Sequence, residues 1–416
     1  MKKFLLVEDS NIVIKIIKHV IKSNTDLQYD VAQSFAAAKQ CIEKHGAKNY
    51  LVAIVDLTLP DAPDGEVVDY TIELGIPTIV LTGNFDEAKC EQMLEKNIVD
   101  YIVKESRYSY EYVIRIVNRL AKNEQIKILV VDDSKMSRNY ISRLLKTHLY
   151  QVYTADDGDT ALEVLEKEKD IKLLITDYNM PRMNGFELVK NIRKEVSKND
   201  LVVIGLSAEG DPRLTTKFIK NGANDFLSKP FSHEEFHCRI LHNIESLEYA
   251  QTMKHMAYHD LVTGLPNKPK FFTDGNLELD KAQEQGAPIS LALISIDQIH
   301  NIQDNYGLDA PDMAMKSLST LLPKAFGRFQ YARINDSDIA VLMAGLSIDQ
   351  AEKLVNGFRM IVEDHIVLID DTNFNFTISA GVTDSTNQSL ISLLKEADNR
   401  LYLTREEGIN SVGISE

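Results

Sequence analysis

The first half of this 416-residue chain repeats one pattern of short apolar runs at a nearly constant spacing. Each run ends in acidic or small polar residues, and stretches with helical spacing lie between the runs. Equivalent residues stand 121 to 125 positions apart, and the matched pairs are Asp9 and Asp133, Asp56 and Asp177, Thr82 and Ser207, and Lys104 and Lys229. Apolar runs that alternate with helices are typical of parallel sheets, so the pattern predicts a duplicated, doubly wound α/β domain.

The matched polar residues all stand at the carboxyl ends of their apolar runs, where an open parallel sheet has its ligand crevice. We therefore expect them to meet at one site in each copy. Clustered carboxylates suit Mg²⁺, and a carboxylate beside this ion can attack phosphorus. A lysine and a hydroxyl would contact the transferred phosphoryl group. Such a site produces an acyl phosphate on aspartate.

This pattern resembles the response-regulator receiver family, with receiver domains at 1–122 and 125–235. The resemblance implies a flavodoxin-like fold and a Mg²⁺ site in each copy. In the second copy it implies these roles: Asp177 as phosphoacceptor, Asp132, Asp133 and Asp177 as metal ligands, Ser207 and Lys229 as phosphoryl contacts, Phe226 as switch aromatic residue, and a cis peptide bond between Lys229 and Pro230.

In the first copy the resemblance implies an equivalent set of roles: Asp56 as phosphoacceptor, Glu8, Asp9 and Asp56 as metal ligands, Thr82 and Lys104 as phosphoryl contacts, and Tyr101 as switch aromatic residue. This copy departs from the pattern in two places. No proline follows Lys104, and the segment from Asp56 to Gly65 is one residue longer than that from Asp177 to Gly185. We therefore expect an altered acceptor loop. A receiver fold kept for dimerisation alone is the alternative for either copy.

Apolar residues at three- and four-residue steps continue beyond the second copy, at Ile240, Ile244, Leu247, Met253 and Met256. This spacing predicts one long amphipathic helix, with a helical stalk at 236–256. Two interpretations stay open. The helix pairs across a homodimer as a coupling stalk, or it is the last receiver helix and packs on its own sheet.

The remainder of the chain, residues 257–416, contains three segments of a second recognisable pattern: AYHDLVTGLPNKPKF at 257–271, FTISAGV at 376–382 and EADNRLYLTREEGIN at 396–410. These segments resemble the GGDEF diguanylate-cyclase family, which has an α/β fold of the nucleotidyl-cyclase type. Members of that family join two GTP molecules into cyclic di-GMP. Their chemistry needs two Mg²⁺ ions held by two carboxylates.

The residues that this chemistry needs are replaced here. The degenerate motif consists of Ser295, Asn335, Asp336, Ser337, Asp338 and Ile339. Ser295 and Ser337 stand where the family has its two metal carboxylates, and Asn335 and Asp336 replace a glycine pair that allows close approach of a nucleotide. Asp312 keeps its family identity as a candidate nucleotide contact. These departures predict a cyclase-like domain without turnover.

The charge and composition of the chain disfavour some classes of binding partner. The 62 acidic residues exceed the 46 basic ones, and the formal charge of −16 disfavours nucleic acid and anionic lipid. No apolar run approaches membrane-spanning length, so we expect no membrane segment and a cytoplasmic location. Three scattered cysteines predict buried thiols in a reducing compartment.

The leading hypothesis is a response regulator that a histidine kinase or phosphotransfer protein phosphorylates. Its inactive GGDEF-like domain would pass the signal to an unidentified downstream protein, within a homodimer. One alternative is a weak diguanylate cyclase in which Asp297, Asp336 or Asp338 recruits metal. Another is a sensor that binds GTP or cyclic di-GMP without turnover.

Overall fold

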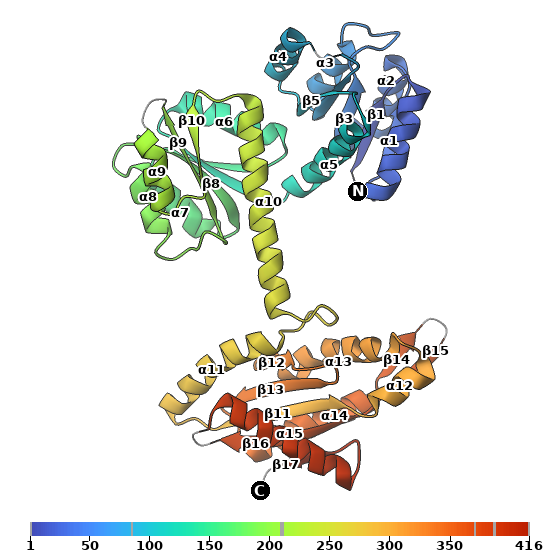
Figure 1. Ribbon diagram of the computed structural model, residues 1–416, viewed down its shortest axis with the longest axis vertical. Coiled ribbons are helices and arrows are strands. Elements are labelled where there is room, and N and C mark those ends of the chain that lie inside the picture. The colour runs from blue at the N-terminus through green and yellow to red at the C-terminus, as the bar shows by residue number, and fades with distance from the viewer. Residues whose placement is uncertain (1, 85, 209–211, 370–371, 386–387, 415–416) are drawn as a thin grey trace. The chain divides into compact units, whose positions relative to one another are not determined.

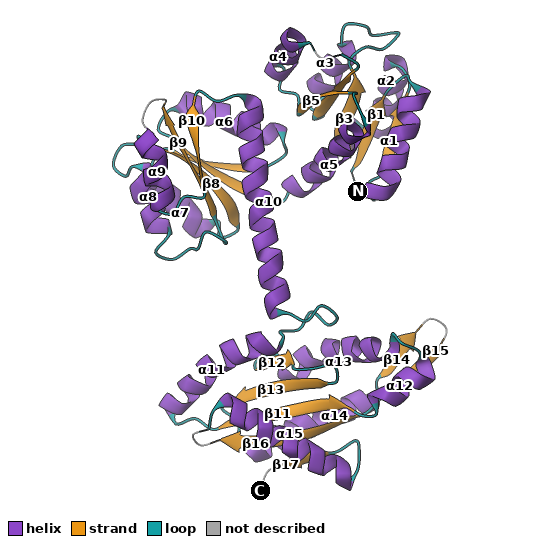
Figure 2. Cartoon of the chain, viewed as in Figure 1, coloured by secondary structure: helices purple, strands orange, loops and turns teal. Residues whose placement is uncertain are grey.

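The computed structural model describes residues 2–84, 86–208, 212–369, 372–385 and 388–414 (Figure 1). The chain divides into two compact units, 1–250 and 251–416. Figure 2 shows helices and strands alternating through the first unit. Within the described ranges, no helix combines the length and the apolar character needed to cross a bilayer.

The first sheet has five parallel strands in the order β2-β1-β3-β4-β5. The strands are β1 (Lys3–Val7), β2 (Tyr29–Ala32), β3 (Tyr50–Asp56), β4 (Thr78–Thr82) and β5 (Asp100–Val103). The helices are α1 (Asn11–Asn24), α2 (Phe35–His45), α3 (Glu66–Glu73), α4 (Glu87–Glu95) and α5 (Arg107–Asn123). Apolar side chains of α1 and α5 cover one face of the sheet, and those of α2, α3 and α4 cover the other.

The second sheet repeats this arrangement with five parallel strands in the order β10-β9-β8-β6-β7. The strands are β6 (Lys127–Val131), β7 (Gln151–Ala155), β8 (Ile171–Asp177), β9 (Val202–Ala208) and β10 (Asp225–Lys229). The helices are α6 (Lys135–Thr147), α7 (Gly158–Lys167), α8 (Gly185–Ile192), α9 (Pro212–Lys220) and α10 (His233–Tyr258). The predicted pair of flavodoxin-like, doubly wound folds is therefore confirmed.

The strands that carry the predicted acceptors are continuous apolar runs because helices cover both faces of each sheet. Every residue of β3 is buried, and β8 is buried except at Lys172. These strands end at Asp56 and Asp177, so each aspartate lies at the carboxyl edge of its sheet. Burial of the apolar run thus positions the predicted acceptor.

The loops after β1 and β6 are fixed by serine caps. The hydroxyl of Ser10 accepts a hydrogen bond from the backbone N–H of Val13, and Ser134 accepts one from the N–H of Ser137. Capping of this kind satisfies N–H groups that the first turn of a helix leaves unpaired. The helices α1 and α6 therefore begin immediately after the acidic pairs and hold them at the sheet edge.

Helix α10 confirms one of the two interpretations that its sequence left open, packing on its own receiver sheet, and its pairing across a homodimer stays a prediction. Its first half packs on the second sheet through Ile240, Ile244 and Leu247, which are all buried. Its second half exposes Met253 and Met256, which are 62% and 48% exposed. The helix is therefore the last receiver helix at its start and carries an unpartnered apolar surface towards its end.

The second unit has a mixed sheet in the order β12-β13-β11-β16-β17 and a separate hairpin of β14 and β15. The strands are β11 (Ile289–Ile296), β12 (Gln330–Arg333), β13 (Asp338–Ala344), β14 (Ile366–Ile369), β15 (Thr372–Asn375), β16 (Ile378–Ser385) and β17 (Val412–Ile414). The helices are α11 (Lys268–Gln285), α12 (Ile299–Tyr306), α13 (Ala310–Phe326), α14 (Ile348–Glu363) and α15 (Leu390–Glu407). β11 lies at the centre and pairs antiparallel with β13 and β16.

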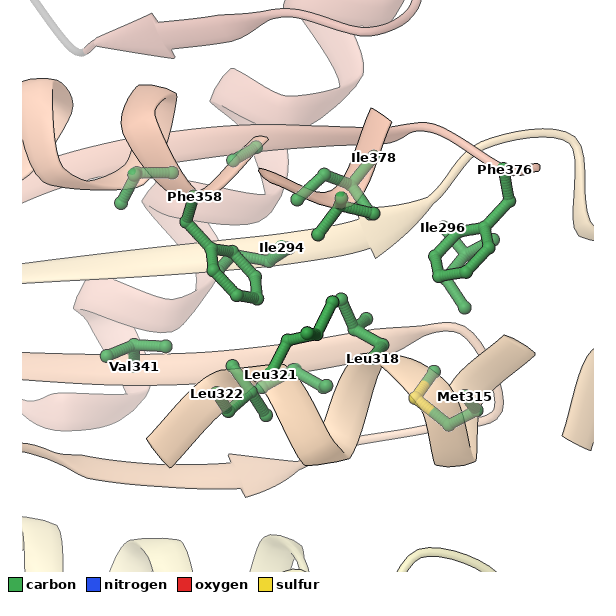
Figure 3. Packing of buried hydrophobic residues seen from close by; sticks show 14 of the residues in the cluster. Ile294, Ile296, Met315, Leu318, Leu321, Leu322, Val341, Phe358, Phe376 and Ile378 are labelled. Carbon is green, nitrogen blue, oxygen red and sulfur yellow. The ribbon is translucent and has the colours of Figure 1, made fainter. Parts of the chain in front are cut away.

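The larger core of this unit lies between the sheet and helices α13 and α14. Figure 3 shows Ile294 of β11 on the sheet side of this core, with Leu321 of α13 and Phe358 of α14 on the helix side. Phe326 is fully buried and packs edge-on against Phe358, with ring centroids 5.0 Å apart. Phe326 is therefore a core residue.

The prediction of buried thiols is correct for Cys90 and wrong for the other two cysteines. Cys41 is only partly buried and Cys238 is exposed. On α10 the neighbouring Phe236 and Ile240 face the sheet, which turns the intervening Cys238 away from it.

Candidate functional site

In the first receiver fold, the predicted residues meet at the carboxyl edge of the sheet. The ammonium of Lys104 lies 2.7 Å from Glu8 Oε2 and 2.7 Å from Asp56 Oδ2. Burial raises the pKa of Glu8, although Lys104 opposes this shift. Burial also works to lower the pKa of Lys104, but its hydrogen bonds to Asp56 and Glu8 raise it. The lysine thus links two carboxylates whose mutual repulsion it offsets.

A divalent cation fits the acidic end of this cluster. One carboxylate oxygen each from Glu8, Asp9 and Asp56 lies within 4.8 Å of the others. Glu8 and Asp56 are buried, whereas Asp9 is exposed. Oxygen ligands from two or three acids, with the remaining positions open to water, suit Mg²⁺. The predicted metal residues of this copy are therefore brought together.

The longer acceptor loop of the first copy is tied to a neighbouring helix. Its Asp61 carboxylate accepts hydrogen bonds from the backbone N–H groups of Phe35 and Ala36, at 2.9 and 3.0 Å. Leu59 and Ala62 exchange backbone hydrogen bonds within the loop. The extra residue thus forms a small turn whose acid caps α2, a role that the sequence analysis did not anticipate.

In the second receiver fold, Lys229 occupies the place of Lys104. Its ammonium lies 2.7 Å from Asp132 Oδ2 and 2.6 Å from Asp177 Oδ1. Burial raises the pKa of Asp177, and the hydrogen bond from Lys229 works against that rise. The peptide bond between Lys229 and Pro230 is cis, as predicted. Acceptor, acid and lysine therefore converge here as well.

The acids predicted to bind metal in the second copy are arranged less tightly than those of the first. Among the described residues, Asp132, Asp133 and Asp177 do not gather one oxygen each within 4.8 Å of the others. Asp133 is exposed, and Ser137 donates a hydrogen bond of 2.5 Å to Asp132. The first copy has Val13 where the second has Ser137, so this hydroxyl distinguishes the two sites. The position of Ser137 in the sequence, three residues after the capping Ser134, did not reveal that its hydroxyl contacts Asp132.

The hydroxyl residues predicted as phosphoryl contacts and the predicted switch aromatics are buried in both copies. Thr82 and Ser207 are buried at the ends of β4 and β9. Phe226 is 9% exposed and packs against Phe218, with ring centroids 5.6 Å apart. Tyr101 is 8% exposed in the core of the first copy. Both predicted aromatic residues thus point inward.

In the second unit, the degenerate motif lies where β11 meets the β12–β13 hairpin. Ser295 is fully buried and pairs across the sheet with Asp338. Its hydroxyl has no hydrogen-bond partner among the described residues. Ile339 is buried, whereas Asn335 and Asp336 are exposed at the turn. The first predicted metal position therefore holds a small buried alcohol.

The hairpin is closed by its own polar side chains. Asn335 donates a hydrogen bond to one oxygen of Asp338, and Ser337 donates one of 2.8 Å to the other. Arg333 bonds the backbone carbonyls of Asn335 and Asp336, each at 3.0 Å. The space that a glycine pair would leave open is thus crossed by hydrogen-bonded side chains.

Asp297, the acid that directly follows the central strand β11, accepts hydrogen bonds from four donors. The hydroxyls of Thr377 and Ser379 donate to its two oxygens at 2.9 and 2.7 Å. The N–H of Asn410 and the guanidinium of Arg405 complete the set at 3.0 and 3.3 Å. A carboxylate has about four acceptor sites, so little capacity is left for a metal. The donors lie far along the chain, and no local signal identified them.

Asp312, the candidate nucleotide contact, is exposed in the first turn of α13. His300 and Gln303, on the neighbouring α12, are also exposed. These side chains face solvent, and none of the hydrogen bonds described above reaches them.

Comparison with known families agrees with this architecture. The response regulator receiver domain matches residues 4–110 and 128–241, which together are more than half of the chain. The diguanylate cyclase, GGDEF domain, matches residues 257–411.

Individual relatives support the same assignment. The chain is 42% identical over 103 residues to the two-component response regulator ORR3 of Oryza sativa subsp. indica, a match that covers 25% of this chain and 79% of the rice protein. It is 41% identical over 108 residues to a chemotaxis protein CheY homolog of Campylobacter jejuni subsp. jejuni, covering 26% of this chain and 83% of that protein. A solved structure of a two-component system response regulator/GGDEF domain protein is 41% identical, with a TM-score of 0.56, and covers 60% of this chain and 100% of its own. The chain therefore belongs to the response-regulator family, with two receiver domains followed by a GGDEF domain.

Proposed function

We propose that Asp177 and Asp56 accept phosphoryl groups from a histidine kinase or phosphotransfer protein, and that the GGDEF domain passes the signal on by protein contacts without making cyclic di-GMP. The saturation of Asp297 by protein donors is the observation that carries the second half of this proposal. These bonds occupy the acid that stands two residues after Ser295, at the end of β11, and remove it from metal chemistry.

The receiver geometry supports phosphoryl acceptance. In each receiver a carboxylate oxygen of the acceptor aspartate attacks phosphorus and displaces the phosphorylated group of the donor, while the lysine beside the acceptor neutralises charge on the incoming group. Ser207 and Thr82, near the ends of the neighbouring strands, would bind a phosphoryl oxygen. Mg²⁺ bound by the adjacent acids would supply the remaining positive charge.

A phosphoryl group adds a charge of about −1.5 to −2 and three strong acceptor oxygens at the sheet edge. In the second receiver these oxygens draw the Ser207 hydroxyl inward, which changes the space beside Phe226. Phe226 of β10 belongs to the core on one face of the sheet, and its neighbour Leu227 packs with the first half of α10 on the other face. A shift of β10 would therefore carry the change at Asp177 to α10, the helix that continues into the next domain.

The hydrogen bonding of Asp338 and the full exposure of Asp336 disfavour a weak cyclase. Both oxygens of Asp338 accept hydrogen bonds from neighbouring side chains, and Asp336 projects fully into solvent. A nucleotide sensor is disfavoured because Asn335 and Ser337 cross the turn where a nucleotide would approach.

The end of α10 supports a homodimer. Tyr249, Met253 and Met256 are 68%, 62% and 48% exposed and follow a spacing that places them on one helix face. A second copy would bury this face. The receivers would then control how two such helices pair.

This switch is tested by sedimentation velocity of the full chain with Mg²⁺, with and without acetyl phosphate, in the absence of nucleotide. We expect acetyl phosphate to shift the protein towards a dimer, and Asp177→Asn to prevent the shift. Met253→Glu should weaken the dimer by placing charge in the apolar contact. Gln251→Glu, which places the same charge on the opposite side of α10, should not. A wild-type protein that sediments identically with and without the donor would contradict the proposal.

A further inference from the structure

Three histidines gather in the second receiver, away from the acidic site. His148 follows α6, whereas His233 and His237 stand four residues apart in the first turns of α10. The ring centroids of His148 and His237 are 3.6 Å apart, those of His233 and His237 are 4.5 Å apart, and those of His148 and His233 are 6.3 Å apart. The cluster thus joins a turn and a helix that are 85 or more positions apart in the chain.

The three rings share an unusual lack of partners. In the described part of the chain, none of the Nε2 atoms of His148, His233 and His237 has a hydrogen-bond partner, although each of these atoms is buried. Burial lowers the pKa of all three rings, that of His148 to about 3, so the rings are neutral at pH 7. A buried polar atom without a partner destabilises the fold, so three in one place call for an explanation.

The ring of His148 also meets the first receiver. The backbone of Val99 there opposes the fall in the pKa of His148 that burial causes. In metal sites, an acceptor beside one ring nitrogen fixes the tautomer and orients the other nitrogen towards the ion.

The cluster lines a cavity of about 500 Å³ within the first unit. Its polar lining includes the three histidines together with Glu234, Cys238 and Tyr112. This volume leaves room for an ion, and for a water molecule as a further ligand.

We propose that His148, His233 and His237 bind a divalent transition-metal ion of the zinc class. The residues His233 to His237 read HEEFH on a helix, a spacing at which two imidazoles on one helix face chelate zinc. That short pattern is common by chance, and the third histidine is the independent observation: His148 stacks on His237, and its buried Nε2 has no hydrogen-bond partner among the described residues. Imidazole nitrogen suits zinc, copper and nickel ions, whereas Mg²⁺ prefers oxygen, so this site is chemically distinct from the receiver acids.

Binding requires a modest rearrangement of the rings. The ligand atoms of the three histidines do not lie within 4.8 Å of one another in the described structure. With metal–nitrogen bonds of about 2.0 to 2.1 Å in a tetrahedral site, ring centroids lie roughly 5 Å apart. The observed separations are 3.6, 4.5 and 6.3 Å, so binding requires side-chain rotations that open the stack of His148 on His237.

The test is a Co²⁺ titration of the metal-free full chain in excess Mg²⁺, which keeps the acidic receiver sites occupied. We expect one equivalent of Co²⁺ to bind with a visible absorption spectrum typical of tetrahedral coordination, and Zn²⁺ to displace it. His237→Gln should weaken binding by on the order of 100-fold, because one of three ligands is lost. His233→Gln should do the same if the first variant does not fold, as judged by its unfolding temperature in chelator.

The matched control is the double variant His255→Gln and His259→Gln. These residues form a second stacked pair on and just beyond α10, with ring centroids 4.1 Å apart, and His255 is exposed. The control should bind Co²⁺ as the wild type does. The proposal is overturned if no stoichiometric binding occurs, if the His237 and His233 variants bind normally, or if the control alone loses binding.

Discussion

Replacing Asp177 by asparagine is expected to abolish phosphoryl uptake by the second receiver. The substitution keeps the size of the side chain but removes the nucleophilic oxygen, so uptake at this site should fall by on the order of 100-fold or more. Intact-protein mass spectrometry after incubation with acetyl phosphate and Mg²⁺ measures it as the loss of one phosphoryl adduct. Asp56→Asn should remove a second adduct independently, and the double variant should carry none.

Asp159→Asn is the matched control, because Asp159 is an exposed acid in the first turn of α7. It makes the same chemical change outside the cluster and should leave uptake unaltered. An Asp177→Asn protein that retained every adduct of the wild type would place the acceptor elsewhere.

Replacing Asp297 by alanine is expected to destabilise the sheet of the GGDEF domain by about 3 kcal/mol, because four donors lose their common acceptor. Arg405 is partly exposed and recovers some hydration, which keeps the expected loss below that of a fully buried pair. Amide hydrogen exchange of the full chain, read by mass spectrometry, measures the effect locally. Protected amides of β11 and β16 should exchange on the order of 100-fold faster.

Asp336→Ala is the control for this change, because Asp336 is a fully exposed acid of the same domain. Its β11 and β16 amides should exchange as in the wild type. Unchanged exchange in Asp297→Ala would contradict the structural role and return Asp297 to the set of acids available for metal.

The strand ends that form the receiver sites were predictable because two simple constraints act together. Parallel strands buried on both faces must be apolar throughout, so Asp56 and Asp177 stand out where the runs end. Sheet topology then brings the strand ends to one edge, which is why Lys104 and Lys229 reach acids 48 to 97 positions away. Because the pattern occurs twice in the chain, comparison of the two copies identified the apolar strands and the polar residues at their ends.

The remaining contacts were not predictable because they depend on where side chains point after distant segments meet. Asp297 is bonded by residues 80 to 113 positions later, and these donors carry no pattern of their own. Asp61 caps the start of α2 by accepting hydrogen bonds from Phe35 and Ala36, which stand 26 and 25 positions earlier in the chain. The stacking of His148 on His237 likewise depends on the packed fold. Only the four-residue spacing of His233 and His237 can be read from the sequence.

Phosphorylation is proposed to act through a GGDEF domain that does not turn over GTP. Incubation of the full chain with Mg²⁺ and GTP, with and without acetyl phosphate, followed by chromatography of the nucleotides, tests this proposal. We expect unchanged GTP and no cyclic di-GMP in either sample, while the protein gains aspartyl phosphate. Cyclic di-GMP that appears with the wild type and disappears with Asp338→Ala would contradict it, and would identify a phosphorylation-gated cyclase with an unusual metal site.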